Sequence, residues 1–197
     1  MIKQKIIYGT HNDEEQNYLI ISSILLPNHE FKGFQPETFR IIDKDKSYLR
    51  SKQKAIEIEL KIVHSGHVNK AWASYQSFNL IATKSSDQNL YVFDYTKHSF
   101  SSSGETFNPQ FILKGHDSEG WGIDWSLTGH QIVSSDNNGR LCVYDLENES
   151  NGQETTQIEG KKQFTMEPIF TQDFHSKETA INEAKFYRFN PNLIGFV

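Results

Sequence analysis

Residues 116–145, HDSEGWGIDWSLTGHQIVSSDNNGRLCVYD, begin with a histidine and end with an aspartate that closes an apolar run. The segment from His64 to Asp94 has the same layout, in which KAWASY, NLIATKSSD and LYVFD correspond to GIDWS, HQIVSSD and LCVYD. The histidine and the aspartate are 29 residues apart in one segment and 30 in the other, and the two histidines are separated by 52 residues. Agreement at several offsets indicates an internal repeat, which is the sequence signature of a repeat architecture.

Short strands separated by polar turns are expected throughout the chain, because apolar residues alternate or cluster between Gly, Asn, Asp and Ser. No long amphipathic helix pattern is present, so the predicted class is all-β. The strands are expected at 6–10, 17–26, 55–63, 69–75, 79–84, 89–94, 121–126, 131–135, 140–145, 168–171, 182–189 and 193–197.

The order of features in the repeat is a histidine turn, three strands, an aromatic residue followed by aspartate, and then a fourth strand. This order is typical of the blades of WD-repeat β-propellers. We therefore predict an incomplete WD-repeat propeller with about three blades and the start of a fourth. The expected units cover residues 1–63, 64–114, 115–172 and 173–197. Residues 28–54 and 147–165 are polar and show little periodicity, which favours loop insertions.

Composition sets limits on function. The net charge of −5 disfavours sequence-independent binding to nucleic acid and favours basic partners. Cys142 is the only cysteine, which excludes an internal disulfide framework and a Cys-rich zinc site, and its apolar neighbours favour a place in the core. No apolar run reaches the roughly 18–20 residues of a membrane-spanning helix.

The repeat histidines and aspartates can form buried hydrogen-bond chains, which are tolerated only when the groups satisfy one another. Counting seven residues back from the end aspartate reaches Asp87 in one repeat and Asn138 in the other. We expect His64 to pair with Asp87. His116 should use Asn138, or Asp136 if the turn is shifted. The full set with expected structural roles is His64, Asp87, Asp94, His116, Asn138 and Asp145.

Catalytic and metal sites are the competing interpretations of these residues. A metal centre would need histidines from separate blades to converge, and the sequence has no HxH, HExxH or CxxC motif. A serine nucleophile would lack the GxSxG elbow. We therefore expect no catalytic residues, no metal and no cofactor.

Polar and aromatic residues recur between each turn and the strand that follows it. Because repeat proteins place equivalent loops on the same side, these residues could form one recognition face, with simple solvation as the alternative. The candidate peptide-binding residues are His11, Glu15, Asn69, Lys70, Glu119, Trp121 and Asn182.

Four segments carry a more specific resemblance: IIYGTHNDEEQNYLIISSILLP, IEIELKIVHSGHVNKAWASY, IATKSSDQNLYVFDYTKHS and LKGHDSEGWGIDWS. They resemble the retinoblastoma-binding, histone-chaperone family of WD-repeat proteins from about residue 3 to residue 197, with gaps at the two loop insertions. The resemblance implies a nuclear, seven-bladed, non-catalytic scaffold that binds histone tails and similar basic peptides on its acidic top face. Its expected partners are the other subunits of chromatin-assembly and chromatin-modifying complexes, without sequence-specific nucleic-acid binding and without a membrane.

The resemblance also implies roles for the candidate residues. Carboxylates would accept hydrogen bonds from Lys or Arg, Trp121 would offer a cation–π surface, and Asn69 and Asn182 would bond peptide backbone. His67 and Asn182 stand where the family tends to carry carboxylates, and Trp121 replaces a tyrosine, so peptide preference is expected to differ. The N-terminal helix of the family's second, histone-helix groove is not expected in this chain.

The number of blades leaves a further alternative open. Seven blades need about 300 residues, whereas the chain has 197. A fragment, a truncated paralogue and a propeller completed by a partner all fit this length. The partner-completed form gives the rival function, a structural subunit that donates blades through its open strand edge. An enzyme centred on the propeller ranks below both.

Overall fold

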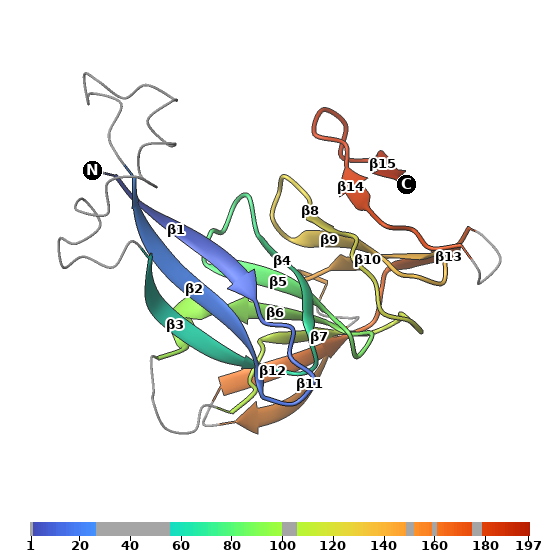
Figure 1. Ribbon diagram of the computed structural model, residues 1–197. Helices are drawn as coiled ribbons and strands as arrows, with labels where there is room; N and C mark the ends of the chain where they lie inside the picture. Colours follow the sequence, from blue (N-terminus) through green and yellow to red (C-terminus); the bar gives the residue numbers. More distant parts are fainter. Residues whose placement is uncertain (1, 27–55, 100–105, 149–151, 159–160, 175–178) are drawn as a thin grey trace, which may run out of the picture.

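The computed structural model describes residues 2–26, 56–99, 106–148, 152–158, 161–174 and 179–197. The expected loop at 28–54 lies outside these ranges. The chain is all-β in the described residues, apart from a short 3-10 helix at Tyr95–Lys97. The strands form four sheets, and the second of these also includes two strands, β11 and β12, that come later in the chain (Figure 1).

The first sheet has the order β1-β2-β3 and is antiparallel. Its strands are β1 (Ile2–Gly9), β2 (Asn17–Leu26) and β3 (Ile56–His64). The sequence expectation for all three holds, although β1 begins earlier than expected. Alternation along β3 explains why the prediction succeeded, since Leu60, Ile62 and His64 are buried while Lys61 between them is exposed.

The next two sheets are the two repeats recognised in the sequence. The second sheet contains β4 (Val68–Ala73), β5 (Leu80–Ser85), β6 (Leu90–Asp94) and β7 (Phe111–Leu113) as antiparallel neighbours. The third contains β8 (Ile123–Trp125), β9 (Gln131–Ser135), β10 (Arg140–Asp145) and β13 (Phe170–Asp173). The last sheet is the pair β14 (Ala184–Phe186) and β15 (Ile194–Phe196).

The expectation of a loop at 147–165 is wrong for the described part of this range. Its described part forms a hairpin of β11 (Gly152–Ile158) and β12 (Lys161–Met166), which extends the second sheet through a parallel pairing of β12 with β7. Phe164 stacks on Phe111 at 5.8 Å between ring centroids, and Met166 is buried. The polar composition concealed the hairpin because β11 is the outermost strand and only a few β12 side chains need to be apolar. The short strand β7 was also missed.

The sheets are arranged like blades around an axis. The first strands of successive sheets are neighbours: β1 contacts β4, β4 contacts β8, and β8 contacts β14. Gly9 permits the closest of these approaches, because a Cβ atom there would lie 2.1 Å from the Cβ of Val68. Apolar clusters fill the spaces between the sheets, and the largest, between the second and third sheets, contains the fully buried Trp125 and Tyr144.

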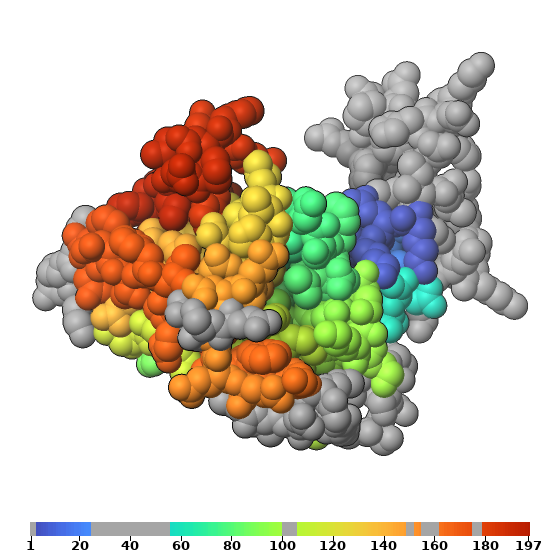
Figure 2. All heavy atoms as spheres, turned by 180° about the vertical axis from the view of Figure 1, so that it is seen from behind, coloured from blue at the N-terminus to red at the C-terminus, as the bar shows by residue number. Residues whose placement is uncertain are grey.

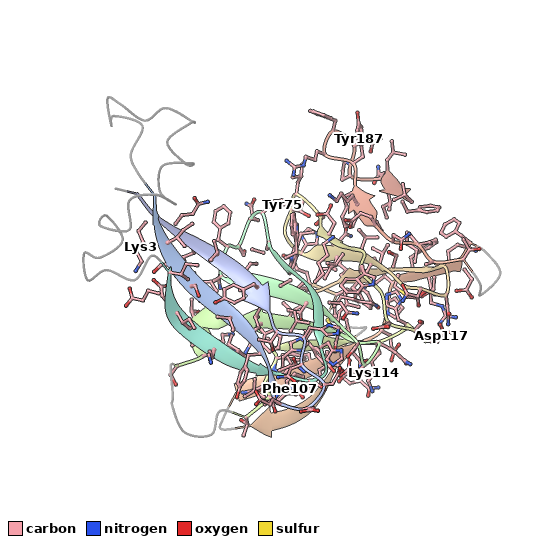
Figure 3. The ribbon with its side chains drawn as sticks, in the orientation of Figure 1. Lys3, Tyr75, Phe107, Lys114, Asp117 and Tyr187 are labelled. Atoms are coloured by element: carbon pink, nitrogen blue, oxygen red, sulfur yellow. The ribbon has the colours of Figure 1, made fainter. Side chains whose placement is uncertain are left out.

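Two rims follow from this arrangement. The top rim consists of the β1–β2, β3–β4, β5–β6, β7–β8 and β9–β10 connections. The bottom rim contains the β4–β5, β8–β9 and β14–β15 turns, at 74–79, 126–130 and 187–193. The ends of β6 and β10, with Asp94 and Asp145, lie on the same side, because Tyr95 and Leu146 donate backbone hydrogen bonds to Asn79 and His130. Figure 3 shows Lys114 and Asp117, from the β7–β8 connection, on the opposite side of the molecule from Tyr75 and Tyr187 of the bottom rim.

Candidate functional site

The third sheet holds a buried hydrogen-bond chain under the top rim. His116 Nδ1 lies 2.9 Å from Asp136 Oδ2, and His116 Nε2 bonds to the hydroxyl of Ser134. The other Asp136 oxygen accepts the backbone N–H groups of Asn138 and Arg140 at 3.0 and 2.9 Å. The side chains of His116 and Asp136 are both 0% exposed. These hydrogen bonds therefore tie the β7–β8 connection to the β9–β10 hairpin.

The second sheet has an equivalent set of hydrogen bonds around His64, but no aspartate takes part in it. His64 Nε2 lies 2.8 Å from Thr83 Oγ1, and His64 Nδ1 faces the Gly66 carbonyl at 3.2 Å. The expected pairing of His64 with Asp87 is wrong, because Asp87 instead accepts the hydroxyls of Ser65 and Tyr91 at 2.7 and 2.5 Å.

The expected pairing of His116 with Asn138 is also wrong, and the shifted alternative, Asp136, is the partner. Asn138 donates to Asp117 at 3.1 Å instead. The register explains both corrections, since each turn has five residues between paired strand ends and only its first position reaches the histidine. Asp136 occupies that first position in one repeat, whereas Ser85 occupies it in the other.

The end aspartates organise the opposite ends of the same sheets. Asp94 Oδ1 accepts from Asn79 at 3.0 Å and from the Thr96 hydroxyl at 2.6 Å. Asp145 accepts from Gln131 at 3.3 Å and from the backbone N–H of Glu147 at 3.1 Å. Both carboxylates therefore fix the chain where it leaves the third strand of the sheet.

Stability is expected to fall on mild acidification because of the buried histidines. Burial lowers the pKa of His116 to about 4, with the Lys84 charge acting in the same direction, and burial also lowers the pKa of His64. An unfolded histidine titrates near 6.5, so the unfolded chain binds more protons than the folded chain between pH 6.5 and about 4. The free energy of unfolding should be highest above pH 6.5 and should lose about 3 kcal/mol from His116 by pH 4.

Urea unfolding at a series of pH values measures this loss. In His116→Asn the slope between pH 6.5 and 4 should be shallower, with the remainder carried by His64. An unchanged slope in the variant would show that His116 titrates normally in the folded protein.

The candidate His11, in the β1–β2 turn, forms a histidine pair on the top rim with His67 of the β3–β4 connection, which was not among the candidates. The rings of His11 and His67 lie 3.8 Å apart, and His67 Nε2 faces Asp13 at 3.0 Å. Glu15 is exposed and accepts a long hydrogen bond of 3.4 Å from Asn12. The pair brings the β1–β2 turn onto the β3–β4 connection, so the first two sheets share one rim surface.

A second group joins the second sheet to the third. Asn69 Nδ2 donates to Glu119 Oε2 at 3.1 Å and to the Gly120 carbonyl at 3.3 Å. Trp121 is 44% exposed. A Cβ atom at Gly120 would lie 2.4 Å from the Ser135 carbonyl oxygen, so only glycine allows this close approach. The flanking side chains, Glu119 and Trp121, are both exposed beside it.

The remaining candidates, Lys70 and Asn182, differ in their surroundings. Lys70 Nζ lies 2.8 Å from both carboxylate oxygens of Glu183 and 5.6 Å from the ring centre of Trp72, so it is held in an ion pair. Asn182 is exposed next to Glu183, and its backbone N–H bonds to the Val197 carbonyl at 2.7 Å. The structure thus brings Asn69, Glu119 and Trp121 together and commits Lys70 to Glu183.

Sequence reasoning missed an ionic cluster at the outer part of the top rim. Arg140 binds Asp173 at 2.7 Å, lies 3.5 Å from Asp117 and donates to the Gly115 carbonyl at 2.9 Å. Asp173 ends a strand that lies 33 residues after Arg140, and no local pattern links the two. This cluster and the residues above make the rim predominantly acidic. Its carboxylates are Asp13, Glu14, Glu15, Asp87, Asp117, Glu119 and Asp173.

Two kinds of function find no support in the part of the chain that the structure covers. No group of three or more His, Cys, Asp or Glu side chains could hold a metal ion there. Among the same residues, no helix has the length and apolar character needed to span a membrane.

The repeated four-stranded sheets, the histidine chains and the acidic rim define a WD-repeat β-propeller protein. No family model matches the chain. Histone acetyltransferase type B subunit 2 of Schizosaccharomyces pombe is 33% identical over 199 residues, which cover 98% of this chain and 42% of that protein. The match confirms the resemblance of the chain to the retinoblastoma-binding, histone-chaperone family of WD-repeat proteins. The chain spans less than half the length of this curated relative.

Among solved structures, the β-propeller domain of Cps50 (Swd1) from Myceliophteria thermophila is similar at a TM-score of 0.47. The sequence identity is 15%, and the match covers 68% of this chain and 33% of that domain.

Proposed function

We propose that this protein is a non-catalytic scaffold and histone-binding subunit of a chromatin-assembly or chromatin-modifying complex, which reads basic peptide tails on the top rim. The observation that carries the proposal is the arrangement of Glu119 between Asn69 and the exposed Trp121 on an acidic rim. The relative's description as a subunit of a histone acetyltransferase supports the same class of partner.

The rim chemistry suits a Lys or Arg side chain. Glu119 is exposed and has only Asn69 as a hydrogen-bond donor in the described structure, so its second oxygen is free to accept from an ammonium or guanidinium group. The exposed ring of Trp121 offers a cation–π surface beside it. Glu15 and Asp13 add negative charge at the neighbouring His11–His67 pair, which would attract a second basic residue.

The other parts of the proposal follow from this chemistry. A histone-binding subunit acts in the nucleus and needs neither a metal nor a cofactor. The partners are histone tails or similar basic peptides together with other subunits of a chromatin complex. The rival function, a structural blade donor, is not favoured, because the relative that matches nearly the whole chain is a histone acetyltransferase subunit.

Peptide binding by rim variants tests the proposal. Glu119→Gln removes a charge-assisted hydrogen bond and Trp121→Ala removes a cation–π contact, so the double variant should bind fluorescein-labelled histone H3 or H4 tail peptides about 30-fold more weakly. Fluorescence anisotropy at two salt concentrations measures the loss. Affinity of the unchanged protein should also fall at higher salt because exposed charges are screened.

Glu57→Gln is the matched control, because Glu57 is an exposed carboxylate on β3 and lies outside the rim. It should bind both peptides as the unchanged protein does. Equal binding by the control and the double variant would show that the peptides are held elsewhere.

A further inference from the structure

A lysine of the protein itself occupies an acidic position near the top rim. Lys70 Nζ lies 2.8 Å from both carboxylate oxygens of Glu183 and 5.6 Å from the ring centre of Trp72. A carboxylate beside an indole ring is the same pair of groups that Glu119 and Trp121 offer to a ligand cation. Lys70 is therefore bound within its own chain in the way that a lysine of a basic peptide would be bound.

Glu183 lies beside the segment that carries the proposed peptide site. Gly122 packs so closely on the start of β14 that a Cβ atom there would lie 3.0 Å from the backbone nitrogen of Ala184. Strand β8, which begins at the next residue, contacts both β4 and β14. Figure 2 shows these parts next to one another, with the second sheet in green, the β8–β9 part of the third sheet in yellow and the last residues in red.

An irregularity in β4 directs two consecutive side chains to two different carboxylates. The pairing of β4 with β5 shifts register between Val68 and Lys70, so Asn69 is the extra residue of the shift. Bulges of this kind change the direction of side chains next to functional sites. Asn69 donates to Glu119 at 3.1 Å, while Lys70 binds Glu183. In the described structure, a cation therefore neutralises Glu183, whereas Glu119 has an uncharged amide as its partner.

The ion pair is open enough to exchange with a ligand. The side chains of Lys70 and Glu183 are 21% and 34% exposed. Ion pairs that water reaches contribute little to stability, because water also solvates the separated charges. Lys185 is a further cation at this place, two residues after Glu183, with its Nζ 6.0 Å from the ring centre of Trp72. It is positioned to replace Lys70 on Glu183 when Lys70 is removed.

We propose that Lys70 determines the specificity of the top rim, because it fills a cation subsite formed by Glu183 and Trp72. This inference rests on the proposed function, since it concerns a further basic residue of the same tail. While Lys70 is in place, Glu183 is closed to the ligand, and the tail is held at Glu119 and at the rim carboxylates of the first sheet. Removal of the Lys70 ammonium group opens the subsite to another Lys or Arg of the tail.

Lys70→Met tests the proposal, because methionine keeps an apolar side chain of similar length and removes the ammonium group. The variant should bind the fluorescein-labelled histone H3 tail peptide about fivefold more tightly than the unchanged protein does. Glu183→Gln alone should instead weaken binding about fivefold, because the Lys70 ammonium group then loses its counter-charge and repels the peptide. Both changes together should return the affinity to within about twofold of the unchanged protein. Fluorescence anisotropy measures all four affinities.

Lys114→Met is the matched control, because Lys114 is an exposed lysine of the same rim whose ammonium group makes no ion pair within the described residues. It removes the same charge without uncovering a carboxylate, so the affinity should change by less than about twofold. The double variant Lys70→Met, Lys185→Met allows for replacement of one lysine by the other, and it should bind the tail at least as tightly as Lys70→Met does. Circular dichroism confirms that each variant is folded.

Two results would overturn the proposal. One is an affinity of Lys70→Met, alone and combined with Lys185→Met, that is no higher than the affinity of Lys114→Met. The other is a gain in affinity that persists when Glu183→Gln is added, which would show a general effect of charge. The proposed function fails separately, when the Glu119→Gln, Trp121→Ala double variant binds the tail normally. A gain from Lys70→Met that requires Glu183 would then keep the role of Lys70 and discard that of Glu119.

Discussion

Replacing Asp136 with alanine is expected to lower the free energy of unfolding by about 3–5 kcal/mol. Three donors depend on this buried carboxylate: His116 Nδ1 and the backbone N–H groups of Asn138 and Arg140. The substitution would leave all three without their acceptor. The His116 side chain is fully buried, and an unsatisfied buried donor costs more than the net value of the bond it loses. Urea unfolding followed by tryptophan fluorescence measures the change.

Two variants make the Asp136 result specific. Asp136→Asn keeps one oxygen as acceptor for the two backbone N–H groups and replaces the oxygen that faces His116 with an amide NH2 group, so its loss should be clearly smaller. Asp87→Ala removes an acid from the same type of turn, but Asp87 is only half-buried. It accepts the Ser65 and Tyr91 hydroxyls and one backbone N–H, that of Asn89, so about 1–2 kcal/mol is expected. Equal losses for Asp87→Ala and Asp136→Ala would contradict the assignment of Asp136 as the acid of the histidine chain.

Replacing Trp125 with alanine is expected to cost a similar amount, about 3–5 kcal/mol. Trp125 is 0% exposed and belongs to the apolar cluster between the second and third sheets. Its Nε1 donates to the Trp72 carbonyl of β4 at 2.9 Å, so the side chain connects two blades by a hydrogen bond as well as by packing. The variant would leave a large cavity and an unpaired carbonyl oxygen at that junction.

Trp121 is the natural control, since it lies four residues earlier and is exposed on the top rim. Trp121→Ala should change the free energy of unfolding by less than about 0.5 kcal/mol, while it weakens peptide binding. Urea and thermal unfolding of both variants give the comparison. If Trp121→Ala were as destabilising as Trp125→Ala, Trp121 would be a core residue and its proposed role on the rim would fail.

The segment that opens the repeat therefore combines two functions in a few residues. His116 and Trp125 hold neighbouring elements together, whereas Glu119 and Trp121 remain exposed. Gly120 lies between the two exposed residues, and its close contact with the Ser135 carbonyl brings the connection against the β9–β10 hairpin.

The sequence by itself determined most strands of the repeats, although not β7, together with the all-β class and the place of the candidate rim residues between turn and strand. These features depend on local alternation, because burial on one face of a strand imposes apolar residues at every second position regardless of what packs on that face. The spacing of the histidines and aspartates likewise follows from strand and turn lengths, which are properties of one repeat.

Only the tertiary structure decided which groups meet. The register of each hairpin selects Asp136 over Asn138, and packing between sheets joins Lys70 to Glu183, residues that are 113 positions apart. The β11–β12 hairpin was hidden for a related reason: its pairing partner, β7, lies far away in the chain, and an outer strand needs few apolar side chains. Hydrogen-bond partners between blades are set by how the sheets pack, and local periodicity does not encode that packing.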